Sequence, residues 1–204
     1  TLCPKNQDYA HTVVLIDKTD PLTHSQEIIV RKLVEKIKSN MILFEKLSIY
    51  VLDDQNYSFP EPRFALCNPG NGKGASPLYQ NPRLIQRRFE DNFGEPLDQA
   101  LDGIKLGDTR PNSPIMEMIA AVGALGDFQP NDNRRRLVIF SDMLQHMPDY
   151  SHYRDKIDFT TFAKTDYARS QLIDMRDFEV RVIYLVRNNA VRLQIGRHGI
   201  FWEN

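Results

Sequence analysis

The sequence predicts an α/β fold: a single doubly wound, mainly parallel sheet flanked by helices, with a short antiparallel edge strand. The first observation is the apolar run Thr12–Ile16, which lacks polar-apolar alternation and ends abruptly at Asp17. Such a run is typical of a strand buried on both faces, as central strands of parallel sheets are. The second observation is that strand-like and helix-like segments alternate along the chain, as they do in doubly wound folds.

Size and composition favour one domain of ordinary globular type. The chain has 204 residues, of which 41% are hydrophobic and 26% are charged. Its 26 basic and 27 acidic residues leave a net charge of −1, which gives no electrostatic basis for binding nucleic acid or an acidic membrane. No apolar stretch approaches the roughly 20 residues of a membrane span. We expect one domain over residues 1–204, with an N-terminal arm at 1–11 and a closing segment at 188–204.

Five segments are predicted strands, four of them apolar and one short. In chain order they are Thr12–Ile16, Leu47–Leu52, Arg63–Cys67, Leu137–Phe140 and Val180–Val186. The short segment Arg63–Cys67 is expected at a sheet edge, and an Asn-Pro-Gly loop closes it at once.

Apolar residues at helical spacing predict the helices between these strands. The first helix contains Ile29, Leu33 and Ile37. We expect Asp20 and Pro21 to open it, because Asp caps helices and Pro is tolerated at the first helical position. The other helices are predicted within Asn81–Leu106, with a break around Gly94 and Pro96, after Ser113-Pro114, and over Phe162–Met175.

Three loops place oxygen-bearing side chains at a strand end or a helix start. They contain Asp17 with Thr19, Asn112 with Ser113, and Ser141 with Asp142. Ligands of parallel sheets bind in the crevice beyond the carboxyl ends of the strands. If the strands ending at Asp17 and Asp142 are neighbours, their carboxylates face each other across this crevice. Carboxylates with hydroxyls between them suit a hard divalent cation such as Mg²⁺ or Mn²⁺.

From Thr12 to Val186 the chain resembles the von Willebrand factor type A (vWA) domain and its metal-ion-dependent adhesion site. That family places Asp-x-Ser-x-Ser after its first strand, a Thr in a mid-chain loop and an Asp after its fourth strand. The resemblance implies that the cation is held by Asp17, Thr19, Ser113 and Asp142. One position departs from the pattern, because Pro21 stands where the second Ser is expected and has no side-chain oxygen.

This resemblance implies a non-enzymatic protein-interaction module. The cation would keep one position open for a carboxylate of a protein partner. Polar residues Asp20 and Thr23, together with the loop Met143–Tyr153, would frame the contact.

Two other interpretations of the same residues stay open. A metal-dependent phosphoester hydrolase or nuclease would use Asp17, Asp20 and Asp142 to hold metal ions near a scissile phosphate. It would also need a basic approach surface, which the balanced charge does not favour. In the purely structural interpretation, Asp17, Asp20 and Ser113 only cap helices and complement helix dipoles.

The two cysteines, Cys3 and Cys67, leave a further alternative open. They are either two unrelated thiols or one disulfide that ties the N-terminal arm to the sheet edge. A disulfide would favour an exported or membrane-tethered domain that faces an oxidising space.

Two other groups are expected at the surface. The run Arg134-Arg135-Arg136 precedes a strand and is typical of solvated charges that flank apolar strands. His146 and His152 lack the spacing of a histidine zinc motif, which favours solvent-exposed histidines.

Overall fold

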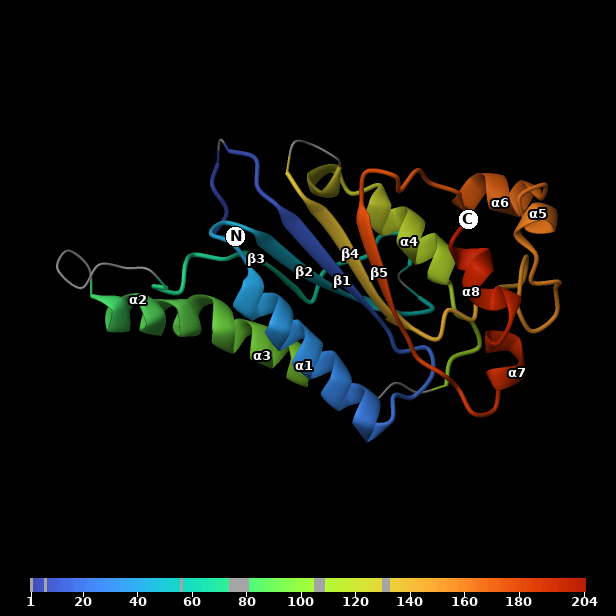
Figure 1. Ribbon diagram of the computed structural model, residues 1–204, viewed down its shortest axis with the longest axis horizontal. Helices are drawn as coiled ribbons and strands as arrows, with labels where there is room; N and C mark the ends of the chain where they lie inside the picture. Colours follow the sequence, from blue (N-terminus) through green and yellow to red (C-terminus); the bar gives the residue numbers. More distant parts are fainter. Residues whose placement is uncertain (1, 6, 56, 74–80, 105–108, 130–132) are drawn as a thin grey trace.

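The computed structural model describes residues 2–5, 7–55, 57–73, 81–104, 109–129 and 133–204. Its centre is a five-stranded sheet of order β3-β2-β1-β4-β5 (Figure 1). The strands are β1 (His11–Asp17), β2 (Lys46–Leu52), β3 (Phe64–Cys67), β4 (Arg135–Ser141) and β5 (Glu179–Tyr184). The β1, β2, β4 and β5 strands run parallel, and β3 runs antiparallel to β2. The predicted fold class is therefore confirmed, with the first strand in the centre.

The central strand β1 is buried along its whole length. In register, Val14 pairs with Ile49 of β2 and with Val138 of β4. Because side chains alternate across a strand, Val14 enters the core on one face of the sheet and Val13 enters the core on the other. Full burial of such a side chain contributes about 1.5–3 kcal/mol. A central strand that is covered on both faces needs apolar side chains on both faces, which explains why polar and apolar residues do not alternate along β1.

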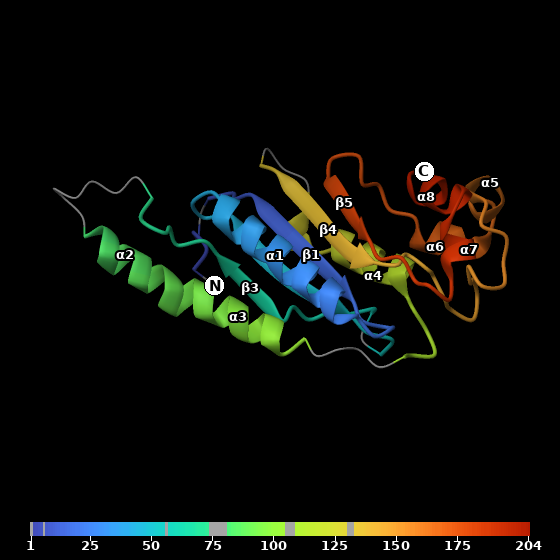
Figure 2. The same cartoon turned by 60° about the horizontal axis from the view of Figure 1, so that its bottom comes forward.

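One face of the sheet is covered by α1 and by a long helical segment that runs beside α1, next to β3 (Figure 2). These elements are α1 (His24–Asn40), α2 (Pro82–Phe89), the π-helical turn η1 (Glu90–Gly94) and α3 (Glu95–Asp102). The expected break near Gly94 is a π-helical turn rather than a gap between two helices. Pro96 lies in the first turn of α3, where its missing N–H is tolerated.

The helix α1 starts later than expected. Its N-cap is Thr23, whose hydroxyl accepts the backbone N–H of Gln26 at 3.3 Å. The Gln26 side chain accepts the N–H of Thr23 in return, at 2.9 Å. This reciprocal capping box fixes the start of the helix at His24, so the prediction that Asp20 and Pro21 open the helix was wrong.

The opposite face of the sheet is covered by α4 (Ile115–Gly123) and the short turn η2 (Gly126–Phe128). Met118 and Val122 of α4 pack against the sheet together with Phe128. As expected, α4 begins directly after Ser113 and Pro114.

The C-terminal part of the chain forms a small cluster of helices beyond β5 (Figure 1). They are α5 (Phe159–Phe162), α6 (Asp166–Gln171), α7 (Val191–Gln194) and α8 (Arg197–Trp202). The single helix predicted over Phe162–Met175 was wrong, because Thr165 caps a new helix by accepting the N–H of Ala168 at 3.0 Å. None of the helices in the described part of the chain has the length and apolar character to cross a bilayer.

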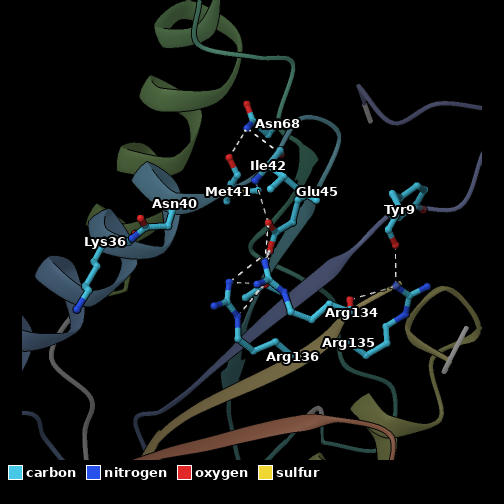
Figure 3. A network of polar contacts seen from close by, with 11 residues as sticks. Tyr9, Lys36, Asn40, Met41, Ile42, Glu45, Asn68, Arg134, Arg135 and Arg136 are labelled. Carbon is cyan, nitrogen blue, oxygen red and sulfur yellow. Dashed lines mark hydrogen bonds and ion pairs between the residues drawn. The ribbon is translucent and has the colours of Figure 1, made fainter. Parts of the chain in front are cut away.

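The amino-terminal edge of the sheet holds a buried ion cluster around Glu45 (Figure 3). Its carboxylate accepts hydrogen bonds from Arg134 at 3.1 and 3.2 Å, from Arg136 at 3.3 Å and from the Thr12 hydroxyl at 2.7 Å. The backbone N–H of Ile42 donates to it at 3.1 Å. Arg134, which is exposed, and Arg136, which is half-buried, therefore both bind a carboxylate that is itself buried.

Arg135, between these two arginines, is also buried. It donates to the carbonyl oxygen of Tyr9 at 2.6 Å and to that of Gln129 at 2.9 Å. The run thus ties the N-terminal arm and two loops to the start of β4. The expectation of a solvated run holds for Arg134, which is exposed, and was wrong for Arg135 and Arg136.

Cys3 and Cys67 form a disulfide with an S–S distance of 2.06 Å. Cys67 is the last residue of β3 and is fully buried. The bridge therefore fastens the N-terminal arm to the antiparallel edge of the sheet.

Candidate functional site

The parallel strands end at the side of the sheet where α7 lies (Figure 1). Buried polar side chains follow these strand ends. Asp17 is the last residue of β1, and Ser141 is the last residue of β4. Since β1 and β4 are adjacent, Asp17 and Ser141 come into contact, and Asp142 follows directly. We call Asp17, Thr19, Ser113, Ser141 and Asp142 the carboxyl-edge cluster.

Asp17 is buried and both of its carboxylate oxygens accept hydrogen bonds. Oδ1 accepts the backbone N–H of Thr19 at 3.0 Å and the Thr19 hydroxyl at 2.7 Å. Oδ2 accepts the hydroxyl of Ser141 at 2.6 Å. The Thr19 hydroxyl also lies 3.0 Å from Oγ of Ser113, which brings the mid-chain loop into the cluster. Three of the four predicted metal ligands, Asp17, Thr19 and Ser113, are thus joined by hydrogen bonds within the protein, and the fourth, Asp142, follows Ser141 directly.

Asp142 is buried and is paired with a cation from the same chain. Its Oδ2 accepts Nε–H of Arg187 at 2.8 Å, and its Oδ1 accepts the N–H of Leu144 at 2.9 Å. Burial raises the pKa of Asp142 to about 6, with the Asp17 charge adding to the rise and Leu144 and Arg187 opposing it.

Arg187 also closes the loop that follows β1. Its guanidinium donates to the carbonyl oxygen of Pro21 at 2.7 Å and reaches the carbonyl oxygen of Asp20 at 3.4 Å. Gln194 of α7 holds the arginine in place, because its side chain accepts the N–H of Arg187 at 2.7 Å and donates to the carbonyl oxygen of Asp142 at 3.0 Å. The position between Asp142 and the β1 loop is therefore occupied by a guanidinium.

The sequence did not lead to Arg187, although a signal was present. Arg187 follows the predicted strand Val180–Val186 directly, as Asp17 follows its strand. The metal-site hypothesis concerns oxygen-bearing side chains at the strand ends. An arginine at such an end therefore had no role in it.

A second pair of carboxylates at the same edge was also missed. Asp53 and Asp54 follow β2, which is the other neighbour of β1. Burial and the adjacent Asp53 raise the pKa of Asp54. Lys18 lies 3.8 Å from Asp53 and Arg110 lies 3.9 Å from Asp54, so the edge alternates acidic and basic groups.

The residues expected to frame a partner contact differ in how exposed they are. Thr23 is exposed but serves as the N-cap of α1, and Asp20 is half-buried beside Arg187. The loop after β4 begins with buried residues, and Met143 belongs to the core, whereas Pro148, Asp149 and Tyr153 are exposed. The Tyr153 ring contacts His146, whose backbone pairs with Ser113, so this phenol lies at the rim of the cluster. Burial and the nearby carboxylates of Asp142 and Asp20 raise the pKa of Tyr153 to about 12.

Comparisons with known proteins add a likeness in fold. No family of known sequences matches the chain, and no curated protein matches it in sequence. The crystal structure of the SpRpn10 VWA domain is similar, with a TM-score of 0.42, 10% sequence identity, and coverage of 91% of this chain and 93% of that chain. The mainly parallel α/β fold rests on the strand order and directions of this chain itself. The similarity says nothing of the chemistry of the carboxyl-edge cluster.

The oxygen donors of the carboxyl-edge cluster are of the type that Mg²⁺ and Mn²⁺ prefer. Asp17, Thr19, Ser113 and Asp142 would hold such an ion, directly or through water, and the ion would offer a partner carboxylate an open position. Two observations oppose binding: Pro21 contributes no side-chain oxygen, and Arg187 competes for Asp142. Within the described residues, no group of three or more His, Cys, Asp or Glu side chains is arranged to hold a metal. The donor chemistry fits a cation, but only in competition with Arg187.

The two histidines after β4 are not both at the surface. His152 is buried and lies 2.9 Å from His198 of α8, measured between ring nitrogens, and His198 contacts the Tyr184 hydroxyl. Burial lowers the pKa of His152 to about 3 and that of His198 to about 4, so both are neutral near pH 7. The expectation of a solvent-exposed His152 was wrong, because α8 folds back over the loop that contains it.

Proposed function

We propose that this chain is a non-enzymatic protein-interaction module whose contact surface is the carboxyl edge of the vWA-like sheet. The observation that carries the proposal is that the two acidic side chains of the carboxyl-edge cluster, Asp17 and Asp142, are already engaged. Both oxygens of Asp17 accept hydrogen bonds, and Asp142 is paired with Arg187. A hydrolase would need a free nucleophile, general base or metal position here.

Exposed aromatic side chains around the cluster support a protein partner. Tyr153 is 49% exposed at the rim, and Phe59 is 89% exposed in the loop that leaves β2 at the same edge. Aromatic residues are enriched in the buried centres of protein interfaces and supply much of their binding energy. The partner we propose therefore combines an apolar surface for these rings with a carboxylate directed at the cluster.

Affinity capture with variants of the edge tests this proposal. We expect a protein retained by the wild type to be lost with Phe59→Ala and with Tyr153→Ala, because each removes an exposed aromatic contact. Truncation of an interface anchor costs about 2 kcal/mol or more, which is roughly a thirtyfold loss of affinity. The matched control is Leu84→Ala, since Leu84 is a 45% exposed apolar side chain on α2, away from this edge.

Two results would contradict the interaction module. One is capture that depends on Leu84 as strongly as on Phe59. The other is hydrolysis of a generic phosphoester in the presence of Mn²⁺ that disappears with Asp17→Ala, which would establish the hydrolase instead.

We also propose that a divalent cation assists the contact when Arg187 is displaced from Asp142. The expected result is that Arg187→Gln strengthens stabilisation by Mn²⁺ or Mg²⁺. A ligand that binds only the native state stabilises it by about 2.7 kcal/mol at a hundredfold excess over its dissociation constant. Thermal unfolding of wild type and variant over a Mn²⁺ titration measures this effect.

Two further variants separate cation binding from loss of the ion pair. Arg110→Gln removes the other guanidinium of the edge and should leave the Mn²⁺ response of the wild type unchanged. Asp142→Asn combined with Arg187→Gln removes both charges and should give no response to Mn²⁺. Equal melting shifts in the wild type, Arg187→Gln and the double variant would exclude a cation at this cluster.

A further inference from the structure

The edge strand β5 is the most exposed strand of the sheet. It pairs with β4 on one side, and the described part of the chain places no strand on its other side. Residues 179–182 are all exposed, with Val180 at 45% and Val182 at 37%. An exposed strand edge presents unpaired N–H and C=O groups and is a template for pairing with another strand.

The outward backbone groups of β5 can be assigned from its pairing with β4. The N–H of Leu185, directly after β5, donates to the carbonyl oxygen of Ser141 at 2.9 Å. Because backbone groups alternate in direction along a strand, odd-numbered residues of β5 face β4 and even-numbered ones face outward. Val180 and Val182 therefore present their N–H and C=O groups at the open edge.

The two faces of β5 differ in chemistry. On the α4 side, Val180 and Val182 line an apolar groove of about 770 Å³, together with Phe178 and Trp202. On the α1 side lie Glu179 and Arg181, in register with Arg136 and Val138 of β4. Within the described residues, neither Glu179 nor Arg181 belongs to an ion pair of this chain.

This order of charges suits antiparallel pairing of β5 with another β5. When Val180 lies opposite Val180 of a second copy, Glu179 of each chain lies opposite Arg181 of the other. In this register the outward groups of Val180 form the hydrogen-bonded pair, and Glu179 and Arg181 occupy the closer, non-hydrogen-bonded positions. Opposite charges at such positions stabilise a strand pair.

The apolar face agrees with the same register, because Val180, which lines the groove, then lies opposite Val180 of the second copy. A pairing centred on residue 181 would place Arg181 opposite Arg181, and one centred on residue 179 would place Glu179 opposite Glu179. Like charges directly opposite each other destabilise a strand pair. Charged edge strands usually discourage pairing. Here Glu179 and Arg181 have opposite charges and lie two residues apart, so the edge of one copy is complementary in charge to the same edge of a second copy.

We propose that β5 is a homodimerisation edge, through which two copies of this chain form one continuous antiparallel junction centred on Val180. The arrangement is isologous, with the same patch on both copies, as in most twofold dimers. It is independent of the carboxyl-edge cluster, so the function proposed for that cluster does not depend on it.

Charge exchange tests both the junction and its register. Sedimentation or light scattering over a concentration series should show a dimer for the wild type. Glu179→Arg puts arginines opposite each other and Arg181→Glu puts glutamates opposite each other, so each should weaken dimerisation at least about tenfold. The double variant Glu179→Arg/Arg181→Glu restores two opposite-charge pairs and should dimerise like the wild type.

An equimolar mixture of the two single variants should also form a dimer, because every position then pairs glutamate with arginine. Glu179 and Arg181 are exposed, so the variants are expected to fold, and circular dichroism checks this. A wild type that stays monomeric at its highest soluble concentration would overturn the proposal. So would single variants that dimerise as well as the wild type, or a mixture that does not form a dimer.

Discussion

Breaking the Cys3–Cys67 disulfide should lower the free energy of unfolding by about 4 kcal/mol, as the chain-entropy model gives for a closed loop of this length. The bridge joins residues 64 apart in sequence, and the loop contains β1, α1, β2 and β3. Without the bridge, the unfolded chain gains freedom that the native state does not. The arm at residues 2–5 also loses its covalent attachment to β3.

Urea unfolding of the wild type with and without reductant measures this contribution. Cys3→Ala is the matched variant, because Cys3 lies in the arm whereas Cys67 is fully buried in the sheet. Reductant should destabilise the wild type and have no effect on Cys3→Ala. Equal unfolding midpoints for the wild type in both conditions would contradict a stabilising bridge.

Thiol titration of the unfolded, non-reduced protein bears on the compartment as well. We expect no free thiol. Disulfides persist where the surroundings are oxidising, so this result would support the prediction of an exported or membrane-tethered domain. Two free thiols would remove the only argument for it.

The elements predicted correctly are those with a local signal. The unbroken apolar run of β1 required a strand covered on both faces, and the central position of β1 supplies that environment. Asp17 and Asp142 were found because each directly follows a buried strand, and adjacency of β1 and β4 then brings them to one edge. The end of a strand can thus be predicted from sequence when the strand itself is apolar.

The parts that were missed depend on contacts between distant segments. Glu45 stands in a loop before β2, where a glutamate is ordinarily solvated, and it is buried because β4 brings Arg134 and Arg136 beside it. His152 is buried because α8 returns over it from 46 residues away. The local sequence around Glu45 or His152 does not predict this burial, because the covering residues come from distant segments that meet only in the folded chain.

The pairing of Arg187 with Asp142 is a third case. Local sequence shows a cation after β5, but it does not show that β5 lies beside β4 and brings the two groups within 2.8 Å. From the sequence alone, an aspartate that follows a strand can therefore be either a ligand of a divalent cation or one half of an ion pair within the chain. The structure separates them by placing the guanidinium between Asp142 and the loop after β1.

Removing the buried carboxylate of Glu45 should also destabilise the protein strongly. Glu45→Ala leaves the Thr12 hydroxyl and the Ile42 N–H without their acceptor, and it removes the carboxylate that pairs with Arg136, which keeps only the Thr12 oxygen as acceptor. Loss of one partner from a buried ion pair typically costs about 3–5 kcal/mol, because the remaining charge is buried without compensation. Urea unfolding of Glu45→Ala beside the wild type measures this loss.

The exposure of the two arginines provides the internal control for this cluster. The Arg134 side chain is 44% exposed and that of Arg136 is 17% exposed, and both contact the fully buried Glu45. Water compensates Arg134 more readily, so Arg134→Gln should cost less than Arg136→Gln. In a double-mutant cycle, Glu45→Gln and Arg136→Gln should show a coupling energy of about 1–3 kcal/mol. Additive effects of these two substitutions, or a loss below about 1 kcal/mol for Glu45→Ala, would mean that the cluster is solvated and does not hold the amino-terminal edge of the sheet together.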